Sequence, residues 1–356
     1  TQKKFALALL PDGRLYCIGS EGAVAELGSG LFKDKAVARE IKGMDFVCVY
    51  DAKGIHRVLI SYGIHRTSYT ADIMLAAYLI NLLGRDFSYL GIASRELGRM
   101  VSPHAERELA HIFEIAERLE EKIKVQGLDR IYRDIELPLA PILAEMETRG
   151  ILYDSTALVA LDAKVTKKIV ALVSAIHKDE GEEFNVNSSQ QLSRILFEML
   201  GIAPAGLRKT EKGGVVSTRE SELEKLRARH PIVAKILDYR ELAKLKSTYI
   251  DALPSLVHPY TKRIHSTFNQ TGTSTGRLSS LNPNLQNIPI MSEYGREIRK
   301  AFVADKGFVL VAADYSQIEL RVAAHLADDA KMIAAFREGA DIHRMTAAAI
   351  NKVLPA

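Results

Sequence analysis

Two acidic residues, Asp314 and Glu319, have the side-chain type and position that suit chemistry on a bound ligand. Residues 308–313, which precede Asp314, are all apolar, and residues 316–326 contain neither Gly nor Pro. An apolar run bounded by Gly predicts a buried strand, and the stretch after it predicts a helix. We therefore expect Asp314 at the carboxyl end of a strand, where sheets present ligand-binding groups. The structural alternative makes Asp314 a helix cap and Glu319 a solvated helix residue.

A polar loop, residues 271–289, precedes this stretch and is too rich in Gly, Pro and amides to belong to a core. Arg277 lies beside Gly276 and small residues that allow another backbone to approach closely. Long ordered loops of this kind are often functional. A cluster of Asn and Pro can equally satisfy its own backbone through Asx turns. The amide side chains of this loop are Asn282, Asn284, Gln286 and Asn287.

The positive charge of the chain is concentrated in one segment. The whole chain has a formal net charge of +4, whereas residues 201–250 hold eleven Lys or Arg against six Asp or Glu. This imbalance favours a polyanionic partner. Arg240 and Lys244 are four residues apart on a predicted helix and share a face, so they can straddle consecutive phosphates. The same pair is also typical of any solvated helical face.

Composition excludes several classes of protein. The length of 356 residues predicts two or three domains, and 47% hydrophobic and 26% charged residues are typical of a globular protein. Two cysteines without a CxxC motif argue against a disulfide framework or a structural zinc site, and favour a reduced, intracellular protein. The sequence contains no run of 18 apolar residues, the length that would predict a membrane span. The sequence has no P-loop, GxGxxG, HExxH, nucleophile elbow or kinase signature.

The predicted elements change character along the chain. Residues 5–19 read as a hairpin around Pro11-Asp12-Gly13, and residues 45–50 as a strand that ends at Asp51. Residues 70–82 predict a buried helix capped by Thr70 or Asp72. This alternation predicts an α/β domain over the first 105 residues or so.

The region from about residue 103 to 185 is predicted to be almost wholly helical. Residues 132–149 are predicted to form a helix that ends at Gly150. The apolar face expected for this helix contains Ile135, Leu139, Ile142, Leu143 and Met146. Further along the chain, residues 263–270 alternate between apolar and polar side chains like a strand.

A carboxylate at a strand end, a loop of amides with an Arg, and a basic helical arm together suit two-metal phosphoryl transfer on DNA. Two divalent ions about 4 Å apart need carboxylates that bridge them. Asp314 is well placed for such a bridge.

The sequence closely resembles family A DNA polymerases, the bacterial DNA polymerase I type, in their Klenow-type large fragment. DYSQIELR (314–321) matches the first palm motif of the family, and TGRLSS with PNLQNIP (275–289) matches the loop along the primer-template duplex. The order and spacing of further matches agree as well. These are IELPLAPILAEMETRGILYD (135–154), FNVNSSQQLSRILFEMLGI (184–202) and LDYRELAKLKSTYIDALP (237–254).

The resemblance implies an α+β multidomain fold. Residues 1–125 would form an RNase H-like α/β domain like the 3′-5′ exonuclease domain of the family, in a form that would be inactive. Residues 126–260 would form the helical thumb with its connecting helices. Residues 261–356 would form the first part of an antiparallel-sheet polymerase palm.

The resemblance also implies roles for the residues around Asp314. Asp314 would be a ligand of both catalytic Mg²⁺ ions, and the carbonyl of Tyr315 would help to bind the ion on the nucleotide side. Glu319 would be the steric gate that crowds a ribose 2′-OH and so favours deoxynucleotides. Three further residues would contact the incoming dNTP: Gln317, Ile318 and His343.

A second set of implied residues would bind primer-template DNA. Arg277 would contact the primer end in the minor groove, whose acceptors are similar for every base pair. Arg240 and Lys244, with the basic loop 209–217, would grip phosphates, which predicts a steep salt dependence. The duplex near the template base would be held by Asn284, Gln286 and Asn287.

The chain departs from the family pattern in two places. The family continues with a fingers helix and an HDE palm motif whose Asp is the second shared metal ligand, and neither occurs in these 356 residues. In the N-terminal domain Asp51 stands where one exonuclease carboxylate is expected, but the earlier DxE and the later Tyr and Asp are absent. We therefore expect no polymerisation by this chain alone and no proofreading.

The function implied is DNA-templated DNA synthesis, transferring a nucleotidyl group from a dNTP to a primer 3′-OH in replication or repair. The alternative is a non-catalytic primer-template-binding fragment, or a subunit of a split polymerase whose second polypeptide or C-terminal extension carries the fingers and HDE motif. The missing carboxylates disfavour a nuclease, and Glu319 disfavours an RNA polymerase. The implied location is the cytoplasm of a bacterial or phage-infected cell, on the nucleoid.

Overall fold

A computed structural model describes most of the chain, and its contacts divide it into two units, Thr1–Val303 and Ala304–Ala356. The described residues are 4–44, 46–66, 68–202, 216–290 and 292–351. The predicted basic loop 209–217 lies mostly outside them.

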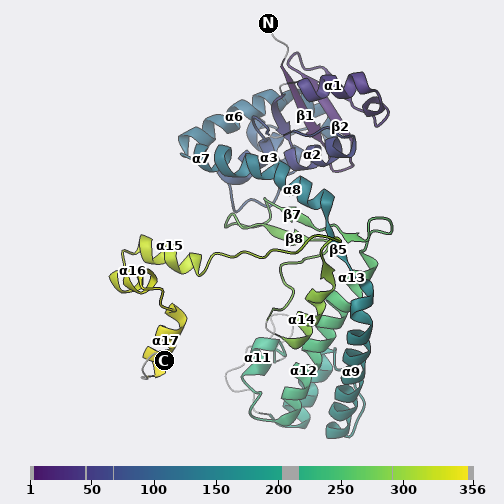
Figure 1. The fold of residues 1–356 in the computed structure, drawn as a ribbon, viewed down its shortest axis with the longest axis vertical. Coiled ribbons are helices and arrows are strands. Elements are labelled where there is room, and N and C mark those ends of the chain that lie inside the picture. Colours follow the sequence, from purple (N-terminus) through teal and green to yellow (C-terminus); the bar gives the residue numbers. More distant parts are fainter. Residues whose placement is uncertain (1–3, 45, 67, 203–215, 291, 352–356) are drawn as a thin grey trace. The chain divides into compact units, whose positions relative to one another are not determined.

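The first unit begins with a four-stranded sheet in the order β3-β2-β1-β4, of which β1 and β2 are labelled in Figure 1. Leu7 pairs with Cys17 in the antiparallel β1–β2 ladder and with Val49 in the parallel β1–β4 ladder. The predicted hairpin around Pro11-Asp12-Gly13 is therefore confirmed, with Gly13 at φ +83° in its turn. The strands are β1 (Phe5–Leu9), β2 (Leu15–Gly19), β3 (Val24–Glu26) and β4 (Phe46–Tyr50).

Helices cover this sheet because their apolar residues pack on it. Ile55 of α2, Tyr78 of α3 and Ile112 of α6 are fully buried in one core with Leu7. The predicted helix at 70–82 is α3, and Asp72 is its cap, accepting a hydrogen bond of 2.8 Å from Met74 N. The helices of this region are η1 (Leu31–Lys33), α1 (Lys35–Gly43), α2 (Ala52–Ser61), α3 (Ile73–Ile80), α4 (Tyr89–Leu97), α5 (Ala105–Glu108), η2 (Leu109–His111), α6 (Ile112–Val125) and α7 (Asp129–Ile131).

A helical region follows, in which α9 packs along α12 (Figure 1). Its two apolar cores share α9: Leu161 and Val165 belong to one, and Ile176 belongs to the other with Ile236. The elements are η3 (Tyr132–Glu136), α8 (Leu137–Arg149), η4 (Ser155–Leu158), α9 (Val159–Glu180), α10 (Ser189–Ser193), η5 (Arg194–Met199), α11 (Glu220–Glu224), α12 (Pro231–Leu245), η6 (Lys246–Ile250) and α13 (Ala252–Ser255).

The buried face of α8 coincides only in part with the predicted one. Ile142 is 55% exposed and Met146 48% exposed, whereas Ala140 and Ala144 are fully buried. The helix packs against α2, and its small residues allow the two backbones to approach. The predicted face is therefore confirmed at Leu143, which is 1% exposed, and wrong at Ile142 and Met146.

Two small antiparallel sheets complete the first unit. One has the order β6-β5-β9, and the other pairs β7 with β8. Gly150 precedes β5 at φ +61°, where a Cβ would lie 2.7 Å from the carbonyl oxygen of Ile264 in β6, so only glycine fits. The elements are β5 (Ile151–Tyr153), β6 (Arg263–Ile264), β7 (Thr267–Asn269), β8 (Ser279–Leu281), α14 (Glu293–Lys300) and β9 (Phe302–Val303).

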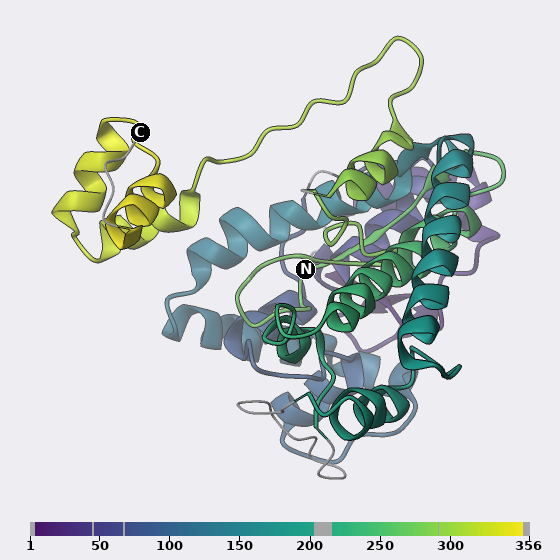
Figure 2. The same ribbon diagram turned by 90° about the horizontal axis from the view of Figure 1, so that it is seen from below.

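The described part of the second unit contains three helices in sequence, drawn in yellow in Figure 2: α15 (Ile318–Leu326), α16 (Ala330–Arg337) and α17 (Ile342–Asn351). The helix predicted after Asp314 is thus present, but the strand predicted at 308–313 is not. Phe308 is 75% exposed and Val311 86% exposed. A strand is completed by hydrogen bonds to a neighbouring strand, and the described part of this unit offers only helices as regular elements.

The combination of many helices with antiparallel sheets is the α+β class that the sequence predicts. Within the described ranges, no helix has both the length and the apolar character needed to cross a membrane.

Candidate functional site

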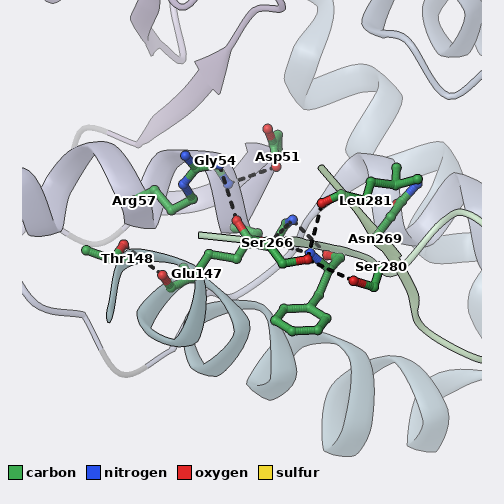
Figure 3. Close-up of polar contacts among 12 residues, drawn as sticks. Asp51, Gly54, Arg57, Glu147, Thr148, Ser266, Asn269, Ser280 and Leu281 are labelled. Atoms are coloured by element: carbon green, nitrogen blue, oxygen red, sulfur yellow. Dashed lines mark hydrogen bonds and ion pairs between the residues drawn. The ribbon is translucent and has the colours of Figure 1, made fainter. Parts of the chain in front are cut away.

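The predicted DNA-contacting loop is built on the β7–β8 hairpin. Phe268 pairs with Ser280 in its ladder, and the exposed Arg277 lies in the turn that joins the two strands. At the base of the hairpin, Ser266 Oγ lies 2.8 Å from Ser280 Oγ and donates to Pro283 O at 2.8 Å. Figure 3 shows Ser266 and Ser280 pointing toward one another. These buried hydroxyls hold both ends of the loop that carries Arg277.

The amides that follow the hairpin are partly used within the loop itself. Gln286 accepts from Ser280 N at 3.2 Å and donates to Leu278 O at 3.1 Å. Asn284 Oδ1 accepts from Gln286 N at 3.0 Å. Asn287 is exposed, and its backbone oxygen accepts from the Tyr249 hydroxyl at 2.6 Å. Gln286 therefore shapes the loop, and the exposed side chain of Asn287 faces solvent.

The two basic residues predicted on α12 differ in their surroundings. Arg240 is half-buried and donates to Thr218 O, and burial lowers the pKa of its guanidinium. Lys244 is exposed one turn later. Lys246, in η6, forms ion pairs with Asp162 and Asp251. Of these three cationic residues, Lys244 is the most exposed to solvent.

In the second unit, the DYSQIELR stretch surrounds the start of α15. Asp314 is exposed and Tyr315 is 80% exposed. Gln317 precedes the helix at φ +53°, a left-handed conformation that in a non-glycine residue is found preferentially at functional sites. Ile318 and Glu319 are exposed in the first turn of the helix.

A hydrogen bond connects this stretch to the DIHRMTA segment. Gln317 Nε2 donates to Asp341 Oδ1 at 3.3 Å, and the same oxygen accepts from His343 N at 2.9 Å. Two residues predicted to contact the nucleotide, Gln317 and His343, thus both donate hydrogen bonds to the carboxylate of Asp341. His343 itself is exposed.

Asp314 is the residue predicted to bind both catalytic metal ions. Asp314 offers the hard oxygen ligands that Mg²⁺ prefers. Throughout the described ranges, however, no group of three or more His, Cys, Asp or Glu side chains is arranged to hold a metal ion. The described residues by themselves do not fit a two-ion site.

Asp51 follows β4, as the sequence predicts, and acts as a helix cap. It lies in the left-handed region at φ +64°, and its Oδ1 accepts from Gly54 N at 2.9 Å. Burial raises the pKa of its carboxyl group. Asp51 and Glu147 line one cavity of about 520 Å³, but Glu147 is engaged by Lys53 and Arg57 (Figure 3 labels Arg57 and Glu147).

Comparison with known proteins decides the family. The model of "DNA polymerase family A" matches residues 155–356, more than half of the chain. The chain belongs to DNA polymerase family A. This match contains every predicted polymerase-site residue and leaves out Asp51.

Relatives extend the likeness beyond the matched range. The chain is 48% identical to "DNA polymerase I, thermostable" of Thermus filiformis over 290 residues, which are 81% of this chain and 34% of the relative. It is 42% identical to the protein of that name from Thermus caldophilus over 359 residues, 98% of this chain and 39% of the relative. The chain thus spans little more than a third of these family A relatives.

A solved structure supports the same family over nearly the whole chain. The POL domain of Pol1 from M. smegmatis, in complex with a DNA primer-template and dNTP, superposes with a TM-score of 0.85. Sequence identity is 32%, and the superposition covers 99% of this chain and 64% of that one.

The residues that anchor the β7–β8 hairpin of this family A chain were not predicted from the sequence. Lys53 of α2 and Glu147 of α8 both bond to the backbone of Phe268 in β7. Gln270 donates to the buried Glu136 at 2.7 Å. A signal was available in part, since Glu136 and Glu147 are acidic residues in a helix with a predicted apolar face, and an acid buried on such a face needs a partner.

Proposed function

We propose that this chain forms the primer-template-binding part of a DNA-templated DNA polymerase, which transfers a nucleotidyl group from a dNTP to a primer 3′-OH. The observation that carries the proposal is the likeness, over 99% of the chain, to a polymerase domain that binds primer-template and dNTP. The DYSQIELR and TGRLSS motifs also support it, because residues 314–316 and 275–277 are exposed on the surface, where a ligand can reach them.

The proposed DNA contacts come from the first unit. Arg277 and Asn287 are exposed on and after the hairpin, and amide and guanidinium groups suit the acceptors of the minor groove. Lys244 contributes an exposed cation that can neutralise a phosphate. Arg240 and Asn284 contribute by shaping their surroundings, because each has a polar group already bonded within the protein. Gln286 belongs with them for the same reason.

The proposed nucleotide contacts come from the second unit. Gln317, Ile318 and His343 bind the sugar and phosphates of the dNTP, and Glu319 crowds a ribose 2′-OH. Mg²⁺, when bound, neutralises the developing charge on the phosphates. Asp314 and the carbonyl of Tyr315 supply ligands of suitable type, and further ligands have to join them, on a C-terminal extension or a second polypeptide.

A second candidate function is primer-template binding without catalysis. One observation favours it: Asp314 belongs to no metal-holding group of three side chains within the described residues. The two candidates differ in one measurable respect, because only the polymerase extends a primer.

Binding of a fluorescein-labelled primer-template by the 356-residue chain tests both candidates. We expect saturable binding that weakens steeply between 50 and 200 mM salt, on the order of the thousandfold change typical of several phosphate contacts. Arg277→Ala should weaken binding, and Arg299→Ala on α14 provides a control that removes the same charge elsewhere. Failure to bind at the lowest salt concentration would refute the proposal.

Primer extension with Mg²⁺ and dNTPs separates the candidates. The chain alone is expected to bind without extending the primer. Extension that disappears in Asp314→Asn would show that the described residues suffice for catalysis. Extension that appears only after a polypeptide bearing an HDE motif is added would assign the chain to a split or longer polymerase.

A further inference from the structure

Strand β7 has one edge paired with β8 and one edge that no other strand covers in the part of the chain that the structure describes. Both backbone groups of Phe268 nevertheless have partners on that open edge. Phe268 N donates to Glu147 Oε1 at 2.8 Å, and Phe268 O accepts from Lys53 Nζ at 2.8 Å. Lys53 and Glu147 also bond to each other at 2.5 Å.

This ion pair offers β7 the hydrogen-bond donor and acceptor that a neighbouring strand would offer. An antiparallel partner exchanges one N–H and one C=O with each bonded residue. Glu147 supplies the acceptor, Lys53 supplies the donor, and their mutual bond fixes the spacing between the two. A short exposed strand edge is otherwise poorly held, because a two-stranded hairpin alone is only marginally stable in water.

The environment of the pair strengthens both bonds. The Glu147 side chain is 2% exposed and the Lys53 side chain 14% exposed, so solvent screens them little. Hydrogen bonds in which one partner is charged are roughly twice as strong as neutral ones. Arg57 also pairs with Glu147, at 3.2 Å, but its side chain is 50% exposed and no bond joins it to Phe268 among those the structure shows.

Two further contacts anchor the same hairpin. Gln270, directly after β7, donates to Glu136 Oε2 at 2.7 Å and to Glu136 O at 3.0 Å. The hydroxyl of Tyr78, in α3, donates to Thr273 O at 2.8 Å. Lys53 and Tyr78 both belong to the sheet-and-helix region at the N-terminus. That region therefore contacts the hairpin at β7 and in the turn that carries Arg277.

We propose that Lys53 is a positioning residue for primer-template binding, which together with Glu147 completes the open edge of β7 and holds the Arg277-bearing hairpin in place. The N-terminal region, whose Asp51 serves as a helix cap, thus contributes to DNA binding rather than to proofreading. The inference rests on the proposed function for its DNA readout, and its structural readout is independent of DNA.

Lys53→Met and Arg57→Met form a matched pair of variants. Each removes one cation from α2 that pairs with Glu147, but only the first removes the donor to Phe268 O. Hydrogen exchange of the 356-residue chain measures the anchoring directly. The amides of Phe268 and Asn269 should exchange about tenfold faster in Lys53→Met, the scale of one charged hydrogen bond, and should be unchanged in Arg57→Met. Amides of β1 and β4 report whether the whole region is destabilised instead.

Primer-template affinity, measured at fixed salt, gives the functional readout. Lys53→Met should lose about fivefold to tenfold in affinity with an unchanged salt slope, since no phosphate contact is removed. Lys53→Arg keeps a cationic donor and should recover most of the loss. Should Lys53→Met not fold, Lys53→Leu replaces it, because leucine also lacks a donor for Phe268 O.

Each outcome decides one question. Equal exchange at Phe268 in the parent and in Lys53→Met would overturn the inference, as would equal affinity of the two. Equal losses of affinity in Lys53→Met and Arg57→Met would also overturn it. The effect would then come from removing a cation beside Glu147 and not from removing the donor to Phe268 O. Faster exchange in a chain that binds no DNA at all would refute the proposed function while confirming the anchoring.

Discussion

The carboxamide of Gln317 donates to Asp341 Oδ1 at 3.3 Å, and that oxygen also accepts from the backbone of α17. The Arg344 N–H and the Gln317 bond lower the pKa of the Asp341 carboxyl group, so it is ionised at neutral pH. One carboxylate therefore holds the start of α15 and the start of α17 together. The residues proposed to contact a dNTP, Gln317 and His343, take their relative positions from Asp341.

Replacing Asp341 tests this arrangement. Asp341→Ala removes the acceptor for His343 N, Arg344 N and Gln317, and loss of such a cap costs about 1 kcal/mol of helix stability. Hydrogen exchange at His343 and Arg344 should accelerate about fivefold. Asp341→Asn keeps a side-chain oxygen and should behave almost like the parent. Equal exchange in the Ala and Asn variants would contradict the capping role.

The surroundings of Lys244 and Lys246 predict different effects on DNA binding. Lys244→Ala should reduce the slope of log affinity against log salt by about one, because one phosphate contact is lost. Lys246→Ala is the matched control: its ammonium group is already paired with Asp162 and Asp251, so the slope should hardly change. Fluorescence anisotropy at several salt concentrations measures both. Equal slopes for the parent and Lys244→Ala would remove Lys244 from the proposed contacts.

Asp51 is expected to affect stability and not nuclease activity. Asp51→Asn retains the cap and tolerates φ +64°, whereas Asp51→Ala loses the cap and is strained at that angle, at a combined cost of about 2 kcal/mol. Urea unfolding of the two variants measures the difference. A labelled single-stranded 3′ end should stay intact with the parent in Mg²⁺ or Mn²⁺. Degradation that Asp51→Asn abolishes would show that Asp51 is an exonuclease ligand.

Asp72 makes stability depend on pH. Burial raises the pKa of its carboxyl group from an ordinary 3.8 to about 7, although Ala52 N donates to it at 2.7 Å. Between these values the folded chain binds a proton that the unfolded chain does not. Its contribution is thus fully present below about pH 4 and is lost as the pH rises through about 7.

Asp72→Asn isolates this contribution. The free energy of unfolding of the parent, relative to that of Asp72→Asn, should fall by at most about 1.4 kcal/mol per pH unit across that window. Above pH 8 the difference should be constant. Urea titrations at pH 4.5, 5.5, 6.5 and 8 supply the measurement, and a difference independent of pH would contradict the raised pKa.

Local patterns along the chain predicted a large part of the fold. The hairpin at residues 5–19, the strand before Asp51 and the helix capped by Asp72 are governed by neighbours in sequence, and the structure confirms them. The same patterns predicted a strand at 308–313, which was wrong, and a buried face on α8, which was wrong at Ile142 and Met146. Each depends on a partner element, which periodicity does not identify.

The candidate site, too, was predicted from the sequence only in part. The order and identity of the DYSQIELR and TGRLSS residues were sufficient to predict family A, which the comparisons confirm. Three contacts at the site were not predicted from the sequence: Arg240 with Thr218, Gln286 with its own loop, and Gln317 with Asp341. Each joins segments that are distant in sequence or that fold back on themselves.

The sequence by itself therefore determined which chemical groups this chain has and which family it belongs to, because both follow from residue identity and order. Only the tertiary structure decided which groups are still exposed to a ligand and which are bonded within the protein. It alone placed Glu147 and Lys53 on the two backbone groups of Phe268, since these contacts join residues 121 and 215 positions apart. Hydrogen bonds and desolvation act through distances in space, and folding sets those distances.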